Sequence, residues 1–292
     1  MVGLGCNNFG MRVDLEGTRA VVEAALDAGV TLFDTADIYG SKGGSESFLG
    51  EVLEGRRDGV LLATKFGQDM GDGTKARGSR AYIHKAIDAS LQRLRTDVVD
   101  LYQYHSPDNV TPFKETFGAL DELVRAGKVR YVGHSNLDAA QVEEVDAICR
   151  EHGYARPVSA QNQYSLLHRE AEDELLPTCK RLGIGVLPYF PLASGLLTGK
   201  YRRGEQPPEG TRLAGRKEVF TDETFDRLEA LEAFAEERGL TLLQVAIGGL
   251  LAQPEIASVI AGATKPEQLR ANVEAADWEP TAEDVAALNT VR

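Results

Sequence analysis

Four residues at the ends of short apolar segments carry groups that could act together on a carbonyl. Asp34 and Tyr39 lie in TLFDTADIY, Lys65 lies in VLLATKF, and His105 closes VVDLYQYH. A carboxylate, a phenol, an amine and an imidazole, each held at the end of a strand, can supply a proton to an oxygen that gains negative charge. The pattern therefore predicts a site that protonates a carbonyl oxygen.

Taken singly, each of these residues has a more ordinary explanation. An Asp after a strand usually caps a turn or helix, a Lys is usually solvated, and a Tyr is usually half-buried packing. Only the joint pattern outweighs those explanations, and it does so only if the fold brings the four side chains together.

Strand-like and helix-like segments alternate along the whole chain. The expected strands begin near residues 2, 31, 59, 98, 129, 157, 183 and 256, and the segments 18–29, 81–95, 113–127 and 137–153 carry apolar residues at helical spacing. Runs of Val, Ile and Leu indicate strands buried on both faces. Eight strands in strict alternation with eight helices predict an α/β fold, a (β/α)8 TIM barrel of one domain spanning residues 1–292.

The active site of such a barrel lies at the carboxyl ends of its strands. The residues expected there are Asp34, Lys65, His105, Ser135, Gln161 and Tyr189. The longest irregular stretch, residues 194–221, is the expected functional loop over that face. Near the end of the chain, Thr281 followed by Asp284 predicts a capped start for one last short helix.

Composition narrows the function classes. The net charge of −13 disfavours binding to nucleic acid, because phosphates repel most of such a surface. Cys6, Cys149 and Cys179 are few and odd in number, which fits free thiols in a reducing compartment. No apolar run approaches the roughly 20 residues that span a bilayer, and no signal peptide is recognisable. A cytoplasmic monomer or weak homo-oligomer, without membrane partners, is expected.

The chain resembles the aldo-keto reductase superfamily through motifs that follow one another in the family's order. They are DTADIYG, ATKFG, LYQYHSPD, GHSN, QNQYSLL, YFPLASGLLTGKY and GATKPEQLRAN, and they span almost the whole chain. The resemblance implies a (β/α)8 barrel that binds NADPH without a Rossmann fold and reduces a small-molecule aldehyde or ketone. Carried over by position, the family's catalytic tetrad falls on Asp34, Tyr39, Lys65 and His105.

The roles implied for the tetrad follow the chemistry of carbonyl reduction. Tyr39 is the expected proton donor, and the Lys65 ammonium is expected to lower the pKa of its phenol. Asp34 would pair with Lys65, while a nitrogen of His105 donates to the same carbonyl oxygen.

The resemblance also implies a cofactor site. Ser135, Asn136 and Gln161 would hold the nicotinamide carboxamide, Tyr189 would stack on its ring, and the backbone of GLLTGK would approach the diphosphate. The implied cofactor residues are Gly5, Cys6, Asn7, Ser135, Asn136, Gln161, Tyr189, Pro191, Leu192, Gly195, Leu197, Gly199, Lys200, Arg212, Gly262, Thr264, Lys265, Gln268 and Asn272. Lys200, Arg212 and the segment from Thr264 would reach a 2′-phosphate, which favours NADPH/NADP+ over NADH. Against this, Arg202, Arg203 and Arg212 could simply solvate a loop.

The spacing of residues argues against several other motifs. GLLTGK is no Walker loop, because three residues separate its glycines and Tyr follows its Lys. GLGCNNFG is no dinucleotide fingerprint, because its third glycine is misplaced. Lys65 could form a Schiff base in an aldolase, but the nicotinamide motifs then have no explanation. The five histidines show neither HxH nor HExxH spacing, so no metal is expected. The serious alternative is an NADPH-sensing, weakly catalytic subunit that acts through a protein partner.

The substrate pocket is expected to be largely apolar. Phe9, Phe66, Tyr104 and Phe190 would wall it, which predicts activated aldehydes and dicarbonyls as substrates and poor use of free sugars. Relatives commonly carry a hairpin ahead of the first strand and a longer C-terminal loop. The start of the chain inside the expected first strand fits either a late start codon or a deletion of the hairpin. Without the longer C-terminal loop, we expect the pocket to be open on that side.

Overall fold

Eight parallel strands form one sheet in the computed structural model, which describes residues 1–291 except for the side chain of Lys217. The strands are β1 (Val2–Gly5), β2 (Leu32–Asp34), β3 (Leu61–Phe66), β4 (Val99–Tyr104), β5 (Val129–Ser135), β6 (Ser159–Gln161), β7 (Gly185–Val186) and β8 (Val259–Gly262). Their order is β7-β6-β5-β4-β3-β2-β1-β8, and every neighbouring pair is parallel.

The sheet curls until its two outer strands approach each other. Val186 in β7 donates its N–H to the carbonyl of Glu255 at 2.7 Å, and Ala257 donates back to Val186 at 3.0 Å. Val186 and Ile256, which leads into β8, thereby form a parallel bridge. This arrangement is consistent with the expected (β/α)8 barrel.

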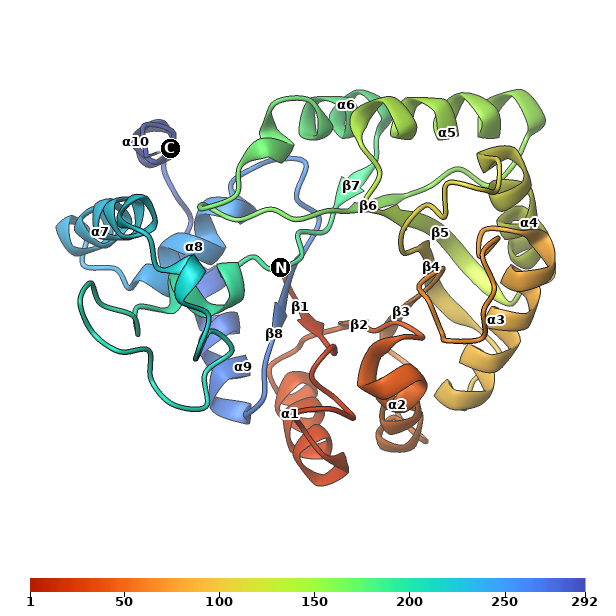
Figure 1. Cartoon of the computed structure of the whole chain (residues 1–292), viewed down its shortest axis with the longest axis horizontal. Coiled ribbons are helices and arrows are strands. Elements are labelled where there is room, and N and C mark those ends of the chain that lie inside the picture. The colour runs from red at the N-terminus through yellow and green to blue at the C-terminus, as the bar shows by residue number, and fades with distance from the viewer. Residues whose placement is uncertain (292) are drawn as a thin grey trace.

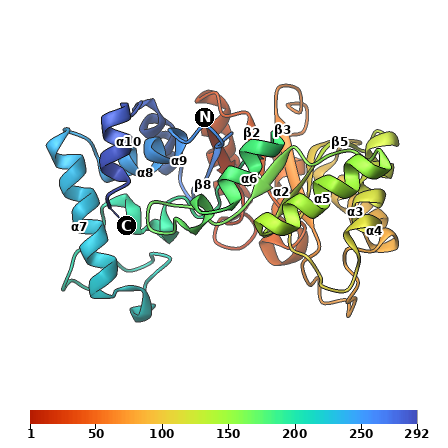
Figure 2. The same cartoon turned by 90° about the horizontal axis from the view of Figure 1, so that it is seen from above.

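Helices cover the outer side of the curled sheet (Figure 1). They are α1 (Leu15–Asp27), α2 (Tyr39–Val52), α3 (Arg80–Leu94), α4 (Phe113–Arg125), α5 (Ala139–His152), α6 (Leu175–Leu182), α7 (Asp222–Glu237), α8 (Leu242–Leu251), α9 (Pro266–Glu274) and α10 (Ala282–Leu288), with 3-10 turns at Glu170–Glu172, Ala193–Thr198, Lys217–Val219 and Ala275–Asp277. Seen from above, α7 and α10 lie at one end of the molecule and α3 and α4 at the other (Figure 2). None of the described helices is long and apolar enough to cross a membrane.

The predicted strict alternation is wrong between β7 and β8, where both α7 and α8 occur. The sequence of α8, LLQVAIGGLL, is apolar on nearly all sides and is buried, so it lacks the one-sided pattern of the other helices. The last short helix is confirmed: the Thr281 side chain accepts from Asp284 N–H, and Asp284 reaches back to Thr281 N–H, closing a capping box before α10.

Strand alternation decides which side chains enter the barrel. Lys65, Gln103 and Gly133 are register partners on β3, β4 and β5 and lie at one level of the sheet. A Cβ at Gly133 would meet the Oγ of Ser159 at 2.2 Å, so this level has no room for another side chain. Phe66 follows Lys65 and therefore points to the other face of the sheet.

His134 on β5 is an internal histidine without partners. Its side chain is fully buried, and neither ring nitrogen has a hydrogen-bond partner among the described residues. Burial lowers the pKa of His134 to about 4. The unfolded chain therefore binds a proton at His134 between about pH 6.5 and 4 that the folded protein does not, and this residue makes the fold less stable as pH falls through that window.

Replacing His134 with Leu should remove that pH dependence. We expect the loss in unfolding free energy between pH 7 and pH 4.5 to be smaller in His134→Leu than in the wild type, by about 2 to 3 kcal/mol. Urea unfolding at the two pH values measures the difference. Asp37, whose pKa burial and then Glu46 raise to about 7, acts with the opposite sign but is common to both proteins. Identical pH slopes would contradict the interpretation.

Candidate active site

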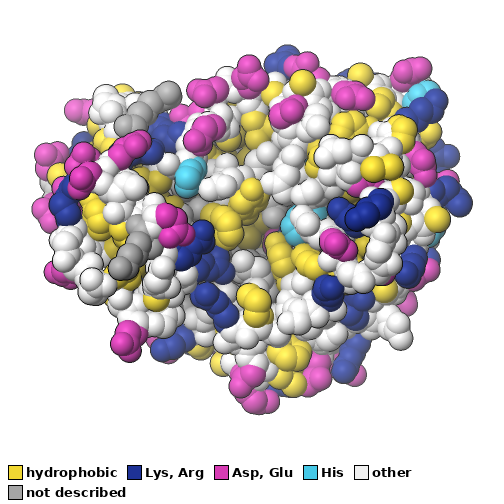
Figure 3. Space-filling view, viewed as in Figure 1, with side chains coloured by type: hydrophobic (Ala, Val, Ile, Leu, Met, Phe, Trp, Pro, Cys, Tyr) yellow, Lys and Arg dark blue, Asp and Glu magenta, His cyan; other side chains and the backbone are white. Residues whose placement is uncertain are grey.

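A cavity of about 1150 Å³ opens at the carboxyl ends of the strands. Asp34, Tyr39 and His105 lie on its wall, and Lys65 is fully buried behind them. Figure 3 shows the molecule hollowed near its middle, with hydrophobic side chains inside the hollow and Lys and Arg side chains gathered on one flank. All four predicted tetrad residues are thus brought to one place.

Asp34 and Lys65 form a buried ion pair. Lys65 Nζ donates to Asp34 Oδ2 at 2.6 Å and to the carbonyl of Thr35 at 2.7 Å. The other carboxylate oxygen, Oδ1, accepts from Gln161 at 2.9 Å and from Gln103 at 3.3 Å. Burial opposes the charge on the ammonium, but Asp34 and then Tyr39 raise the pKa of Lys65 overall. Lys65 is therefore a fixed positive charge at neutral pH.

Tyr39 lies directly over this ion pair. The Lys65 Nζ is 5.1 Å from the centroid of the Tyr39 ring, and the His105 ring stands edge-on to it at 5.8 Å and 88°. Burial raises the pKa of Tyr39, while the Lys65 charge acts in the opposite direction. Lys65 acts on this pKa in the expected direction, but the cost of burying a phenolate outweighs the attraction of one ammonium, so the pKa of Tyr39 is raised overall.

His105 is a neutral imidazole. Burial, and then the charge of Lys65, lower the pKa of His105 to about 3. Its Nδ1 is buried and has no hydrogen-bond partner in the described part of the chain. A buried N–H without a partner is rarer than a bare acceptor, which favours the tautomer with the proton on Nε2.

A left-handed turn fixes the position of Tyr39. The residues from Gly40 to Gly43, which follow Tyr39 at the start of α2, have φ angles of 65°, 60°, 74° and 108°. A Cβ at Gly40 would lie 2.5 Å from both the carbonyl oxygen of Phe9 and the N–H nitrogen of Ser45. Only glycine fits there, and the turn fixes the path of the chain immediately after Tyr39.

The expected carboxamide residues form one hydrogen-bonded chain. Ser135 Oγ donates to the carbonyl of Gln161 at 2.6 Å, and Asn136 Nδ2 donates to the carbonyl of His105 at 2.9 Å. Tyr189 Oη donates to Asn136 Oδ1 at 2.8 Å. Gln161 also binds Asp34, so this chain connects the expected cofactor residues directly to the tetrad.

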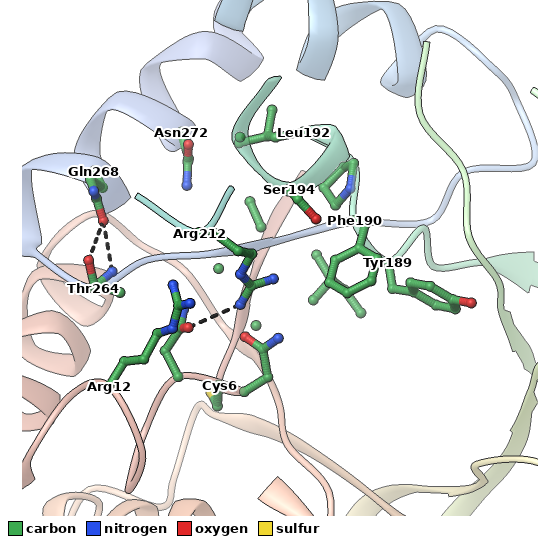
Figure 4. A pocket seen from close by; sticks show the side chains of 18 of the residues that line it. Cys6, Arg12, Tyr189, Phe190, Leu192, Ser194, Arg212, Thr264, Gln268 and Asn272 are labelled. Atoms are coloured by element: carbon green, nitrogen blue, oxygen red, sulfur yellow. Dashed lines mark hydrogen bonds between the residues drawn. The ribbon is translucent and has the colours of Figure 1, made fainter. Parts of the chain in front are cut away.

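Most of the other expected cofactor residues also line the cavity (Figure 4). They are Gly5, Cys6, Asn7, Pro191, Leu192, Gly195, Lys200, Arg212, Gly262, Thr264, Lys265, Gln268 and Asn272. Leu197 and Gly199 are not on the wall. Leu197 is fully buried in the hydrophobic core, and Gly199, between the lining residues Thr198 and Lys200, takes a left-handed conformation with φ of 75° at the end of the 3-10 turn.

Backbone rather than side chain forms part of the cavity floor. Gly5 and Gly262 are register partners at the ends of β1 and β8, and both line the cavity. A Cβ on Gly5 would lie 3.1 Å from the Cγ2 of Ile260, and one on Gly262 would lie 3.4 Å from the Nδ2 of Asn8. The two glycines therefore let a ligand approach the main chain closely.

The expected aromatic wall is mostly wrong. Phe190 lines the cavity, but Phe9, Phe66 and Tyr104 are fully buried and do not. Phe66 stacks on Tyr102 and Tyr104 at 4.8 and 5.2 Å, on the face of the sheet opposite Lys65. Strand alternation excludes Phe66 and Tyr104 from the barrel interior. The cavity wall also carries polar groups besides those of the tetrad, so the pocket is not largely apolar.

Four cationic side chains lie on the cavity wall: Arg12, Lys200, Arg212 and Lys265. Arg202 and Arg203 lie elsewhere, because they form ion pairs with Glu232, Asp222, Asp226 and Glu229 of α7. The solvated-loop explanation therefore fits Arg202 and Arg203 but not Arg212.

Sequence reasoning missed part of the wall. The expected functional loop, residues 194–221, adds Ser194, Thr198, Glu209, Gly210 and Thr211, none of which was expected singly. The residues missed altogether are Asn8, Arg12, Leu243, Ile260, Ala261 and Ala271. Asn8 and Arg12 share the connection after β1 with Asn7, so the expected role of that connection was the signal that could have found them.

The curled parallel sheet carries an acid, a lysine, a phenol and an imidazole at its carboxyl edge. This combination is typical of α/β barrel proteins that bind small molecules at the carboxyl ends of their strands. The chain belongs to the aldo/keto reductase family, whose model matches residues 1–292. An uncharacterized oxidoreductase, YrpG, of Bacillus subtilis (strain 168) is 36% identical over 99% of this chain and 90% of its own length.

Two further relatives have more specific names. A probable voltage-gated potassium channel subunit beta of Oryza sativa subsp. japonica is 35% identical over 93% of this chain and 85% of its own length. The L-glyceraldehyde 3-phosphate reductase of Escherichia coli (strain K12) is 36% identical over 92% of this chain and 81% of its own length. Family and relatives together support oxidoreduction.

Proposed function

We propose that the protein is a single-domain (β/α)8 barrel enzyme that uses NADPH to reduce small-molecule aldehydes or ketones to alcohols, with Tyr39 as the general acid. The observation that carries this proposal is the buried Asp34–Lys65 pair directly beneath a pocket-lining phenol and beside a neutral imidazole. Family membership supports the reaction class.

The four side chains divide the work of proton transfer. NADPH would supply the reducing equivalent at the carbonyl carbon. Tyr39 keeps its proton at neutral pH, because a phenol ordinarily has a pKa of about 10 and burial raises the pKa of Tyr39 further, so the proton is available to an oxygen that becomes basic. The Lys65 ammonium then stabilises the phenolate that remains, and Asp34 keeps the ammonium charged and in place. His105, neutral at pH 7, orients the carbonyl oxygen by donating from Nε2 and does not compete as the acid.

The residues on the wall fit a dinucleotide. Gly5 and Gly262 provide a floor without side chains, Ser135, Asn136 and Gln161 provide donors and acceptors for an amide, and four cations face phosphate chemistry. Asn272, nearly fully buried, presents an amide to the cavity from the last turn of α9. The wall therefore offers groups that fit both the amide and the phosphates of such a cofactor.

A substrate panel tests the proposal. NADPH consumption, followed by its absorbance, should be seen with activated aldehydes, methylglyoxal-like dicarbonyls and phosphorylated aldehydes such as glyceraldehyde 3-phosphate, the type of substrate for which one relative is named. The cationic wall makes the anionic members of the panel informative, because they compete for the same charges. Absence of NADPH consumption with every member would contradict the proposed reaction.

Removing the Arg212 guanidinium should weaken the binding of NADPH more than the binding of NADH. Arg212 faces the cavity, and only NADPH carries the 2′-phosphate that a guanidinium binds strongly. We expect Arg212→Ala to cost NADPH binding about 1.5 to 3 kcal/mol, the range for a hydrogen bond to a charged group, with NADH little changed. Fluorescence titration with each cofactor measures the two losses. Equal losses would mean that Arg212 supports the loop through its bond to Asn8 instead.

A second candidate is supported by the rice relative named as a probable channel subunit. In that reading the barrel binds NADPH, turns over slowly and acts through a protein partner. Steady-state turnover separates the two functions. Reduction at an ordinary enzymatic rate, about 1 s⁻¹ or faster, favours the enzyme, whereas tight NADPH binding with a far slower turnover favours the sensor.

A further inference from the structure

Arg12 is a cation on the cavity wall that lies outside the family motifs and that has not yet been assigned to a particular phosphate. It lies in the connection between β1 and α1 and lines the cavity opposite the 199–221 segment, which carries Arg212. No carboxylate of the described residues pairs with either guanidinium, in contrast to Arg203, which contacts three. Two cations without acidic partners on facing walls require an explanation, because the chain as a whole is strongly acidic.

Arg212 is bonded to Asn8, which lies in the same connection as Arg12. Arg212 Nη2 donates to Asn8 Oδ1 at 3.1 Å, and its Cζ lies 5.5 Å from the centroid of the Phe190 ring. Burial, and then the charge of Arg12, lower the pKa of Arg212, so the two like charges are close enough to repel each other. A ligand group with about two negative charges would relieve that repulsion more than a group with one.

The position of Arg12 indicates which end of the pocket it serves. Arg12 and Thr264 together line both the main cavity and an adjoining cavity of about 520 Å³. Thr264 in turn bonds Gln268 Oε1 through its N–H at 2.8 Å and its hydroxyl at 3.0 Å, at the start of α9. Figure 4 shows the Arg12 guanidinium between Thr264 and Arg212, on the side away from Tyr189. Arg12 therefore faces the α9 end of the pocket and not the tetrad.

We propose that Arg12 and Arg212 bind the 2′-phosphate of NADPH from opposite walls of the pocket, which makes Arg12 a residue that determines cofactor specificity. This rests on the proposed use of NADPH. A 2′-phosphate is a monoester with about −1.5 to −2 charges at pH 7 and three acceptor oxygens, enough for two guanidiniums, whereas each phosphate of the dinucleotide bridge carries one charge. Asn8 holds Arg212 in reach, and Thr264 and Gln268 complete the polar surroundings.

The test compares ligand binding in variants that change one charge. Arg12→Gln removes the cation and keeps a polar side chain, and Arg12→Lys keeps the charge without the planar fork. Arg19→Gln is the matched control, because Arg19 lies on α1, carries the same charge and pairs with Glu51 at 3.6 Å on the surface. Isothermal titration calorimetry gives the dissociation constants for NADPH, NADH and adenosine 2′,5′-bisphosphate. These measurements do not depend on catalytic turnover.

We expect Arg12→Gln to raise the dissociation constants for NADPH and the bisphosphate by about 10- to 100-fold. The dissociation constant for NADH should change by less than about 3-fold. Arg12→Lys should lose less, and Arg19→Gln should leave all three constants unchanged. In the Arg12→Gln/Arg212→Ala double variant the losses should not add, because both side chains contact the same phosphate.

Three results would overturn the assignment. Equal weakening of NADPH and NADH would place Arg12 at the diphosphate. Unchanged cofactor binding, together with a raised KM for anionic aldehydes only, would place it at the substrate. Equal effects of Arg12→Gln and Arg19→Gln would show that Arg12 acts only through the overall surface charge and does not contact the phosphate. A wild-type protein that binds NADPH but reduces no carbonyl contradicts the proposed reaction alone, and the NADPH-to-NADH ratio in the variants still decides the role of Arg12.

Discussion

Tyr39→Phe should lower the rate of carbonyl reduction by about 10²- to 10⁴-fold, the usual contribution of a general acid. The substitution removes the phenolic hydroxyl beside the Asp34–Lys65 pair and keeps the ring that contacts His105. His105 cannot replace it as the acid, because its pKa of about 3 leaves the imidazole neutral at pH 7. Steady-state kinetics at saturating NADPH measure the loss, which should fall on kcat because the hydroxyl acts in the transition state.

The matched control is Tyr131→Phe, which removes a phenolic hydroxyl from an exposed position on β5 outside the cavity lining. We expect its kinetics to match the wild type, and we expect Tyr39→Phe to bind NADPH with unchanged affinity. Wild-type turnover in Tyr39→Phe would refute the assigned proton donor. A parallel loss of cofactor affinity would instead show that the phenol shapes the pocket.

Local patterns in the sequence were sufficient to predict the strands and the place of the tetrad. Most strands lie in short apolar runs, and β2, β5 and β6 end at the polar residues Asp34, Ser135 and Gln161, which mark their carboxyl ends. Because parallel strands place all their carboxyl ends at one edge, Asp34 and His105 could be brought together without knowing any contact. The Thr281–Asp284 capping box is local in the same sense.

What sequence reasoning missed depends on the orientation of side chains and on long-range burial. Phe66 and Tyr104 are near the active residues in sequence, but the alternation of a strand turns them to the opposite face. The pKa of Tyr39 depends on the balance of burial against one ammonium, which requires the surrounding atoms. Arg12 lies in a connection whose path over the cavity no periodicity reports, and its neighbour Arg212 is 200 residues away in sequence.

Lys65→Met should abolish most of the activity and also destabilise the fold. The ammonium is the only cation bonded to Asp34 among the described residues, and both partners are buried. Removing one member of a buried ion pair leaves an uncompensated charge, which costs about 3 to 5 kcal/mol in unfolding free energy, although Gln103 and Gln161 still donate to Asp34 Oδ1. The phenolate that Tyr39 leaves behind also loses its stabilising charge, so we expect kcat to fall about 10²-fold or more.

A double variant separates these two effects. Asp34→Asn in the Lys65→Met background removes the isolated carboxylate, so urea unfolding should show that most of the lost stability returns. Turnover should stay low, because the charge beneath Tyr39 is still missing. If instead the double variant recovers turnover together with stability, Lys65 serves only to balance Asp34 in the barrel interior, and the proton donor does not depend on its charge.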